Sequence, residues 1–206
     1  MENLKLSLFF LTSLWFLFFF CHGIESPQFT VIHSESDLEI RLYKESWWIS
    51  APVQGISFEK ATKEGFHRLY QYIHGNNTNS SKLAMTAPIL TSITPQAKQP
   101  LEYTVSFYLS SKFHGSPPRP LPDLSVKLGR WESLCMVVRK FSGFAGDDNI
   151  TEEVANLMTS LAQSNLTAIL EDKNAYTIAQ YNSSSHLVGR LNEVWMRIAG
   201  SSTEGC

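Results

Sequence analysis

The sequence predicts an α+β fold in which two helices pack against a largely antiparallel curved sheet or distorted barrel. Three observations support this prediction. Short segments rich in β-branched and aromatic residues recur along the chain, two amphipathic helical patterns interrupt them, and the order strand, strand, helix, strand, strand occurs twice. Because the two halves share element order but little sequence, the repeat is only weak evidence for an internal duplication.

The first half is expected to contain five strands and one helix. Ser57 has the side chain of an N-cap, apolar residues recur at spacings of three and four after it, and Gly75 stands where a helix ends. The polar residues 76–82 then predict a loop. The expected strands are Phe29–Ile32, Leu38–Tyr43, Trp47–Ser50, Leu83–Ile93 and Glu102–Leu109.

The second half follows a proline-rich connection, Ser116–Pro122, whose prolines exclude a helix or a paired central strand. A helix is expected over Thr151–Ser164, because apolar residues recur there on one face. The expected strands of this half are Val126–Leu128, Trp131–Phe141, Ala175–Tyr181 and Glu193–Ile198.

Residues 1–23 have the pattern of a secretory signal peptide, and residues 24–206 are expected to form one domain. Behind Lys5, the run Leu6–Phe20 is apolar over about fifteen residues. A membrane-spanning helix needs roughly 20 such residues. Gly23 offers a cleavage position, so the mature chain is expected to begin at Ile24 and to carry no membrane segment; an uncleaved anchor is the alternative.

Glycosylation motifs support a secreted protein, located outside the cell or in the endomembrane lumen. They lie outside the strongly apolar segments, as a glycan acceptor must. The acceptors are Asn76, Asn79, Asn149, Asn165 and Asn182. The net charge of −2, with scattered positive residues, argues against nucleic acid as a partner. We expect a monomer.

Two cysteines remain after the expected cleavage, Cys135 in an apolar strand and Cys206 at the carboxyl end. An oxidising compartment would permit a bridge between them. A terminal tail can also leave both thiols free, with Cys135 acting as a small core residue. Of these two states we favour the unbridged one.

Five short motifs, in the same order along the chain, connect this sequence to a known family. They are Tyr72–Asn77, Lys82–Ile89, Pro117–Pro120, Phe141–Phe144 and Asn192–Trp195. With the aromatic strand around Tyr43, they make the chain from Phe29 to Ile198 resemble the SOUL haem-binding family. The resemblance implies a distorted antiparallel β-barrel of two similar halves with two packed helices. It also implies non-covalent binding of haem or another porphyrin.

The resemblance places the expected tetrapyrrole site on the first helix, at Lys63, Phe66 and Tyr70. Phe66 and Tyr70 lie four residues apart, and Lys63 lies one turn earlier, so the three share a face. Aromatic rings can stack on a planar macrocycle, and a lysine can pair with its propionates. The alternative for Phe66 is that it simply packs against the sheet while Lys63 is solvated.

An iron ligand is harder to assign from the sequence. Family members with a candidate axial histidine carry it at the position of Leu42, so this chain lacks that ligand. His67 and His74, seven apart on the first helix, are the remaining candidates there, because neutral imidazole is a common iron ligand. Met85 is a conceivable thioether ligand, but we expect it to fill the core beneath the helix. The other histidines of the mature chain are His33, His114 and His186.

We therefore expect a carrier or scavenger of haem in the secretory or extracellular space. A binding module of the same fold for another apolar metabolite, or for a protein partner, is the alternative. An enzyme is not expected, because the chain has none of the nucleophile, zinc or phosphate-loop motifs searched for. Glu193 could be a general base, but beside Asn192 it is more simply a hydrogen-bonding residue at a strand entry.

Overall fold

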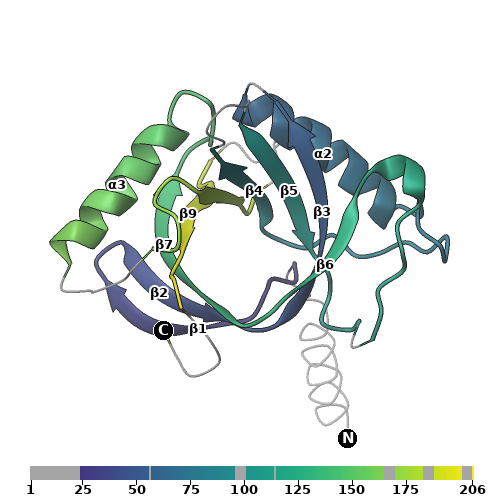
Figure 1. The fold of residues 1–206 in the computed structure, drawn as a ribbon, viewed down its shortest axis with the longest axis horizontal. Helices are drawn as coiled ribbons and strands as arrows, with labels where there is room; N and C mark the ends of the chain where they lie inside the picture. The colour runs from purple at the N-terminus through teal and green to yellow at the C-terminus, as the bar shows by residue number, and fades with distance from the viewer. Residues whose placement is uncertain are drawn as a thin grey trace, which may run out of the picture.

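One antiparallel sheet curves around a central axis, and helices cover its outer face on two sides (Figure 1). This architecture comes from a computed structural model that describes residues 24–55, 57–95, 101–113, 115–164, 170–182, 188–200 and 206. The expected signal peptide, Asn165, His114 and His186 lie outside the described residues.

Within the described residues the sheet has nine strands, in the order β1-β2-β7-β9-β8-β4-β5-β3-β6. The elements along the chain are β1 (Phe29–Glu35), β2 (Leu38–Tyr43), β3 (Ser46–Gln54), α2 (Phe58–Ile73), β4 (Ile89–Thr94), β5 (Glu102–Tyr108), the short 3-10 helix η1 (Pro122–Leu124), β6 (Lys127–Trp131), β7 (Leu134–Ser142), α3 (Ile150–Gln163), β8 (Tyr176–Gln180) and β9 (Leu191–Arg197).

The strand order confirms the predicted barrel-like fold of two similar halves. The unit β3-α2-β4-β5 pairs its strands as β4-β5-β3, and the unit β7-α3-β8-β9 pairs its strands as β8-β9-β7. The two units join where β4 pairs with β8. The strand that precedes each unit pairs with the other unit. Strand β2, which precedes β3, lies beside β7, and strand β6, which precedes β7, lies beside β3. This exchange ties the halves into one sheet.

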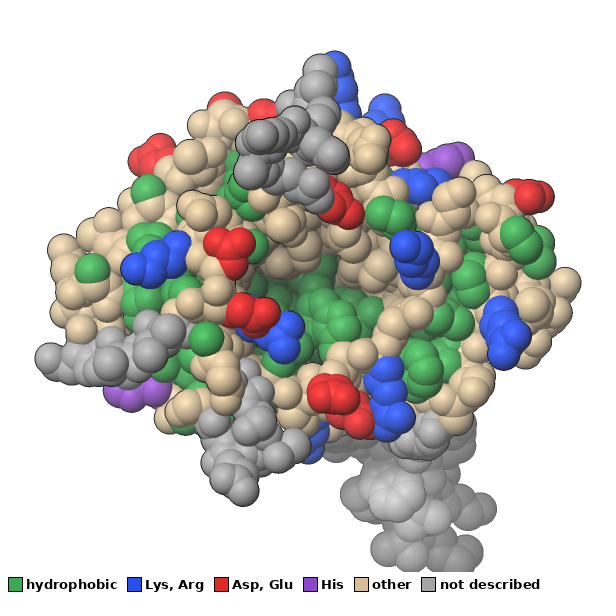
Figure 2. All heavy atoms as spheres, viewed as in Figure 1, with side chains coloured by type: hydrophobic (Ala, Val, Ile, Leu, Met, Phe, Trp, Pro, Cys, Tyr) green, Lys and Arg blue, Asp and Glu red, His purple; other side chains and the backbone are tan. Residues whose placement is uncertain are grey.

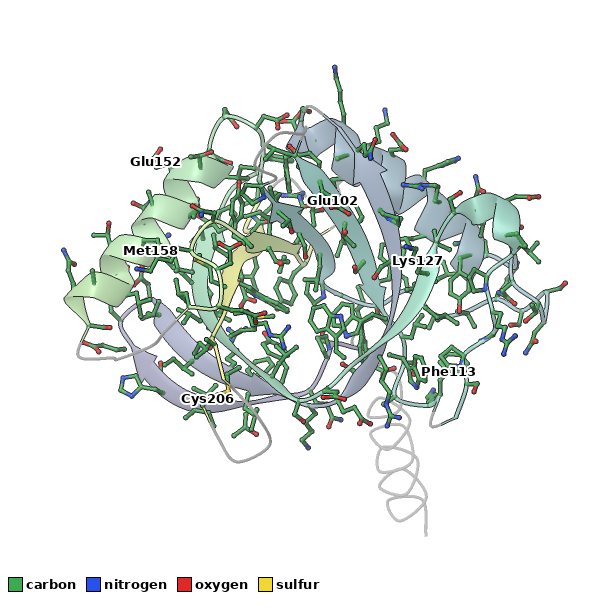
Figure 3. All side chains as sticks on the ribbon, in the orientation of Figure 1. Glu102, Phe113, Lys127, Glu152, Met158 and Cys206 are labelled. Atoms are coloured by element: carbon green, nitrogen blue, oxygen red, sulfur yellow. A yellow bond between two sulfur atoms is a disulfide. The ribbon has the colours of Figure 1, made fainter. Side chains whose placement is uncertain are left out.

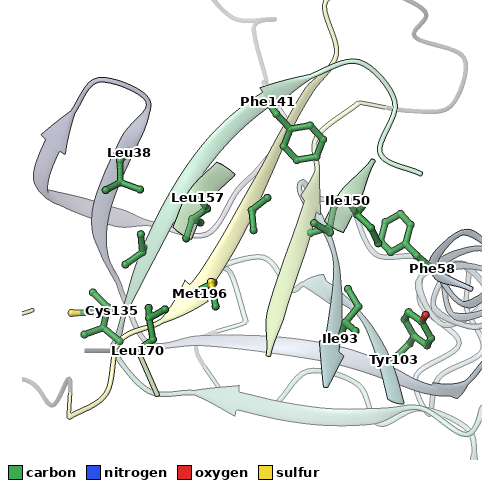
Figure 4. Close-up of a cluster of buried hydrophobic side chains, with 14 of the residues drawn as sticks. Leu38, Phe58, Ile93, Tyr103, Cys135, Phe141, Ile150, Leu157, Leu170 and Met196 are labelled. Carbon is green, nitrogen blue, oxygen red and sulfur yellow. The ribbon is translucent and has the colours of Figure 1, made fainter. Parts of the chain in front are cut away.

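Alternation along the strands separates an outer from an inner apolar surface. On the outer side, Leu69 and Tyr72 of α2 pack with Val105 and Phe107 of β5. Helix α3 covers a second outer cluster, in which Leu157 packs among side chains of β2, β7 and β9 (Figure 4). On the inner side a separate buried cluster gathers Tyr43, Trp48, Leu90, Tyr108, Leu134, Met136, Val138, Ala179 and Trp195.

Helix α2 begins and lies where the sequence predicts, and one glycine sets its distance from the sheet. The backbone N–H of Lys60 donates to the Ser57 hydroxyl at 3.3 Å, which is the expected N-cap. Gly65 lies directly against β5, because a methyl group at this position would be only 2.6 Å from Val105 Cβ. The helix therefore approaches the sheet closely at its centre.

The strand expected over Leu83–Ile93 begins only at Ile89, so its first six residues were wrongly assigned. The backbone of this segment bonds elsewhere. Leu83 N–H donates to the Ile73 carbonyl at the end of α2, and Ala87 N–H donates to the Glu25 carbonyl. The expected strand Trp131–Phe141 is likewise two strands, because β6 ends at Trp131 and β7 begins at Leu134.

The favoured unbridged state of the cysteines is wrong, because Cys135 and Cys206 form a disulfide, with 5.6 Å between their Cα atoms. The topology explains the pairing. Strand β9 runs antiparallel to β7, and the Ile198 N–H that follows it donates to the Cys135 carbonyl at 3.0 Å. The chain thus leaves the sheet beside Cys135, and Cys206 lies near the end of the sheet (Figure 3). Spacing along the sequence carries no sign of this.

In the part of the chain that the structure describes, neither helix combines the length and the apolar character needed to span a bilayer.

Candidate functional site

The expected site residues lie on one flank of α2 and form a row of rings. The Phe66 and Tyr70 centroids are 5.9 Å apart, and the Tyr70 and His74 centroids are 3.8 Å apart, with interplanar angles of 29° and 25°. We call Phe66, Tyr70 and His74 the aromatic row. It arises because residues four apart on a helix are neighbours on its surface.

The row passes from the core to the solvent. Phe66 is half-buried, and its ring meets that of Phe107 in β5 edge-on, with 5.5 Å between the ring centroids. Phe66 therefore also packs against the sheet, which is the alternative given for it above. Tyr70 is 41% exposed, and Lys63 on the same flank is exposed. The row is therefore an open aromatic face with a cation beside it, and none of these residues lines the cavity on the inner side of the sheet that is described below.

The aromatic row faces the seam between the two halves. Phe66 packs in the same cluster as Ile89, the first residue of β4, and Ile89 pairs with Gln180 of β8. Asn182 lies two residues after the end of β8, and residues 183–187 lie outside the described residues. Met85 is 38% exposed, so the expectation that it fills the core is wrong.

The hydrogen bonds of His67 and His74 show which of the two has a ring nitrogen lone pair available for iron. His74 Nδ1 lies 2.9 Å from the Tyr70 carbonyl oxygen, which can only accept, so Nδ1 carries the proton and Nε2 keeps its lone pair. His67 Nε2 lies 2.9 Å from the Gln71 side-chain amide nitrogen, which donates to it, so this lone pair is already in use. Leu42 packs into the cluster beneath α3. Across the described residues, no three His, Cys, Asp or Glu side chains group as a metal site would require.

A buried ion pair lies inside the sheet, at the residue considered above as a general base. Arg41 donates to both carboxylate oxygens of Glu193, at 3.0 and 2.8 Å, and both side chains are 2% exposed. The Tyr181 hydroxyl and the Trp195 indole N–H each donate to Glu193 Oε2 at 2.8 Å. Glu193 thus accepts four hydrogen bonds away from solvent, which suits a structural acceptor rather than a base.

Neighbouring charges extend this network and shift its pKa values. Burial by itself would lower the pKa of Arg41. The hydrogen bonds and the negative charge of Glu193 raise this pKa by more than burial lowers it, so the net shift is upward. Burial, together with the negative charge of Glu193, raises the pKa of the Tyr181 hydroxyl. Burial would raise the pKa of Glu39, yet its bonds to Lys140 and Arg41 hold that pKa below the ordinary value. These groups keep one charge state at neutral pH.

A cavity opens on the inner side of the sheet, with hydrophobic side chains at its base and charged groups at its rim (Figure 2). Its volume is about 570 Å³, and residues of β4, β6, β7, β8 and β9 line it. Trp131 and Trp195 are among them. The sequence predicts both tryptophans in strands of the second half, but no local pattern indicates that β6 pairs with β3 and that both side chains line one cavity.

Comparisons with known proteins agree with this fold and these motifs. The family model described as SOUL heme-binding protein matches residues 24–197. The chain is 33% identical over 160 residues to heme-binding protein 2 of Homo sapiens, covering 77% of this chain and 76% of that protein. It is 30% identical over 159 residues to heme-binding protein 1 of Xenopus laevis, covering 76% and 81%.

Two solved structures share the fold at low identity. The EcmrR C-terminal domain superposes with a TM-score of 0.54 at 11% identity, covering 78% of this chain and 96% of that one. A hydrolase from Listeria innocua gives 0.52 at 10% identity, covering 82% and 94%. Fold, motif order and relatives thus agree: the chain belongs to the SOUL heme-binding protein family.

Proposed function

We propose that this protein binds haem or a related tetrapyrrole non-covalently. One observation carries the proposal: the family match extends over residues 24–197, and the relatives it resembles are named heme-binding proteins. The protein is a binding module in this proposal, and any redox or ligand chemistry belongs to the bound macrocycle.

The aromatic row supports a site on α2. Tyr70 presents an exposed ring next to Phe66 and His74, which fits a flat apolar ligand. Apolar contact contributes roughly 25 cal/mol per Å², so a few rings provide a useful part of micromolar affinity. Lys63 lies where it can meet a propionate, an interaction that salt will screen because the lysine is exposed.

The residues present fit the macrocycle better than they fit the metal. Only one helix histidine, His74, has an uncommitted lone pair, and no further ligand groups with it among the described residues. Shape and charge should therefore supply most of the affinity, with His74 as the candidate ligand for iron. Hemin and metal-free protoporphyrin IX are expected to bind within about threefold of each other, well under the tenfold that 1.4 kcal/mol represents.

Titration with hemin and protoporphyrin IX, followed at the Soret band, tests this function. Tyr70→Ala is expected to weaken both ligands about tenfold, equivalent to ~1.4 kcal/mol. Lys63→Gln should weaken both severalfold at low salt and less at high salt. Lys173→Gln, which changes an exposed lysine in the loop before β8, is the matched control. No saturable Soret shift would reject tetrapyrrole binding and leave another apolar metabolite or a protein partner.

We further propose that the protein acts as a carrier or scavenger in the secretory or extracellular space. The signal pattern of residues 1–23 and the exposed acceptors Asn76 and Asn79 support this location. The Cys135–Cys206 disulfide adds support, because such bonds persist in oxidising compartments. Expression in a eukaryotic cell that secretes proteins should release the protein into the medium, with Ile24 as its first residue. Glycosidase treatment should then increase its electrophoretic mobility. Retention inside the cell without glycans would contradict the location but not the binding.

A further inference from the structure

The cavity on the inner side of the sheet has an aromatic base that is held rigidly. Trp131, half-buried at the cavity, stacks on the buried Trp48 with centroids 4.3 Å apart and an interplanar angle of 24°. Trp195 is buried, and its N–H is bound to Glu193 at 2.8 Å. Two indole rings are thus oriented before any ligand arrives, which lowers the entropy that binding would otherwise lose.

The cavity lining includes one cationic side chain that is placed to meet an anion. Arg130 and Arg197 line the cavity, whereas Glu132 is the one acidic residue in that lining. Both arginines have carboxylate partners outside the lining, Glu45 and Glu171, in exposed ion pairs of the kind that contribute little. The bond from Arg197 to Glu171 uses Nε, one of five guanidinium donors. The Arg130 guanidinium lies over Trp47, 6.0 Å from its ring centroid and toward the outer cluster, so Arg197 is the arginine placed to meet an incoming acid. Its exposed ion pair is not a strong interaction to lose.

Two polar side chains of the cavity wall are already hydrogen-bonded to each other. Ser92 of β4 and Thr177 of β8 both line the cavity, and their hydroxyl oxygens are 2.8 Å apart in a mutual hydrogen bond. A ligand therefore need not satisfy them. The volume of about 570 Å³ falls within the roughly 300–1,000 Å³ typical of small-molecule sites.

We propose that this cavity is a second binding site, for a small flat aromatic molecule that carries one acidic group. The half-buried indole of Trp131 holds the ring system over a base that includes the buried Trp195, and Arg197 at the rim holds the acid. The site is separate from the aromatic row, because α2 packs on the outer side of the sheet and the cavity opens on its inner side. Its occupancy does not depend on tetrapyrrole binding.

A matched pair of dyes tests the site on the intact protein. The probe is 1-anilinonaphthalene-8-sulfonate, and N-phenyl-1-naphthylamine has the same rings without the acid. Saturable fluorescence with one equivalent of the sulfonate dye is expected. Arg197→Gln should weaken the sulfonate dye about tenfold and the neutral dye less than twofold. Arg119→Gln, an exposed arginine in the proline-rich connection, should change neither.

Filling the cavity from either wall supplies the second arm. Ala175→Trp, before β8, and Thr94→Trp, at the end of β4, each place an indole in the cavity at positions that are not fully buried. Each should weaken both dyes at least tenfold, with an unchanged urea midpoint showing that the fold is intact. Tyr70→Ala should leave both dyes unaffected.

Three results would overturn the proposal. The first is dye binding that survives both filling variants in folded protein. The second is an equal loss of both dyes in Arg197→Gln, because the acid would then not be recognised. The third is loss of hemin together with the dyes in Ala175→Trp, because one site would then serve both ligands. Failure of hemin to bind at all, with the dyes behaving as expected, would affect only the proposed tetrapyrrole function.

Discussion

Glu193 links several side chains in the interior of the sheet. It joins Arg41 of β2 to Tyr181 and Trp195, and so connects the edge of one half to the strands beside the cavity. A buried pair of this kind adds little net stability, but losing one partner leaves the other charge uncompensated. We infer that its value to the molecule is to specify which strands lie together.

Glu193→Gln is expected to lower the free energy of unfolding by ~3–5 kcal/mol, measured by urea denaturation. The buried Arg41 then loses its bidentate partner and keeps only Glu39, whose carboxylate lies 2.7 Å from Arg41 Nε. The double variant Arg41→Met/Glu193→Leu should be more stable than Glu193→Gln, because it removes both charges. Lys140→Gln, at an exposed member of the same network, is the control and should change stability by at most ~1 kcal/mol. A Glu193→Gln protein as stable as wild type would show that the pair is not held in this form.

Glu39 should make the protein less stable in acid. Its pKa in the folded state is held below the ordinary value of 4.5 by Lys140 and Arg41, against the upward effect of burial. A depressed carboxyl pKa contributes stability that is present above the unfolded value and is lost as pH falls through the folded value. The gap in urea midpoint between wild type and Glu39→Gln should therefore be larger at pH 7 than at pH 3. A gap that grows on acidification would reverse the sign and refute this account.

At the scale of elements, α2 decides both the packing of the first half and the position of the aromatic row. Ser57, the apolar spacing and the helix end are local signals, so the helix was predictable to within a residue or two. Its distance from the sheet was not, because that distance depends on Gly65 lying over Val105 in a strand far along the chain.

Gly65→Ala is therefore expected to destabilise the protein by about 1–3 kcal/mol through overpacking, although alanine by itself favours a helix by about 1 kcal/mol. Adding Val105→Ala should restore part of the loss, because it removes the atoms that the new methyl group meets. Glu64→Ala, at an exposed position of the same helix, serves as the control. Urea midpoints decide the outcome, and a Gly65→Ala protein that is more stable than wild type would contradict the close approach.

The same variant probes the proposed tetrapyrrole site. Phe66 follows Gly65 directly, so a displaced helix carries the aromatic row with it. Hemin affinity should fall in Gly65→Ala and recover in the double variant, in parallel with stability.

At the scale of the whole molecule, the exchanged strands β2 and β6 and the Cys135–Cys206 bridge hold the halves and the carboxyl end together. The bridge joins residues 71 positions apart, so it restricts a long loop of the unfolded chain. A cross-link of that span typically contributes ~2–4 kcal/mol.

Cys206→Ala should lower the melting temperature by several degrees, in line with that contribution. A reducing agent should lower the melting temperature of wild type by a similar amount and leave Cys206→Ala unchanged. Cys206 is exposed, so its substitution leaves no cavity, whereas Cys135 is buried in the core. Identical melting curves for wild type with and without reductant would mean that the bridge does not stabilise the fold.

The sequence by itself determined the kinds of element, their order and the family motifs, because periodicity, capping and turn residues act over a few neighbouring positions. It also located the rings of the aromatic row, since residues four apart on a helix must be neighbours. Only the tertiary structure decided the disulfide, the Arg41–Glu193 pair and the cavity beside Trp131 and Trp195. The ion pair and the cavity need the exchanged strand pairing between the two halves, and the disulfide needs the pairing of β7 with β9. Such long-range register leaves no local pattern in the sequence.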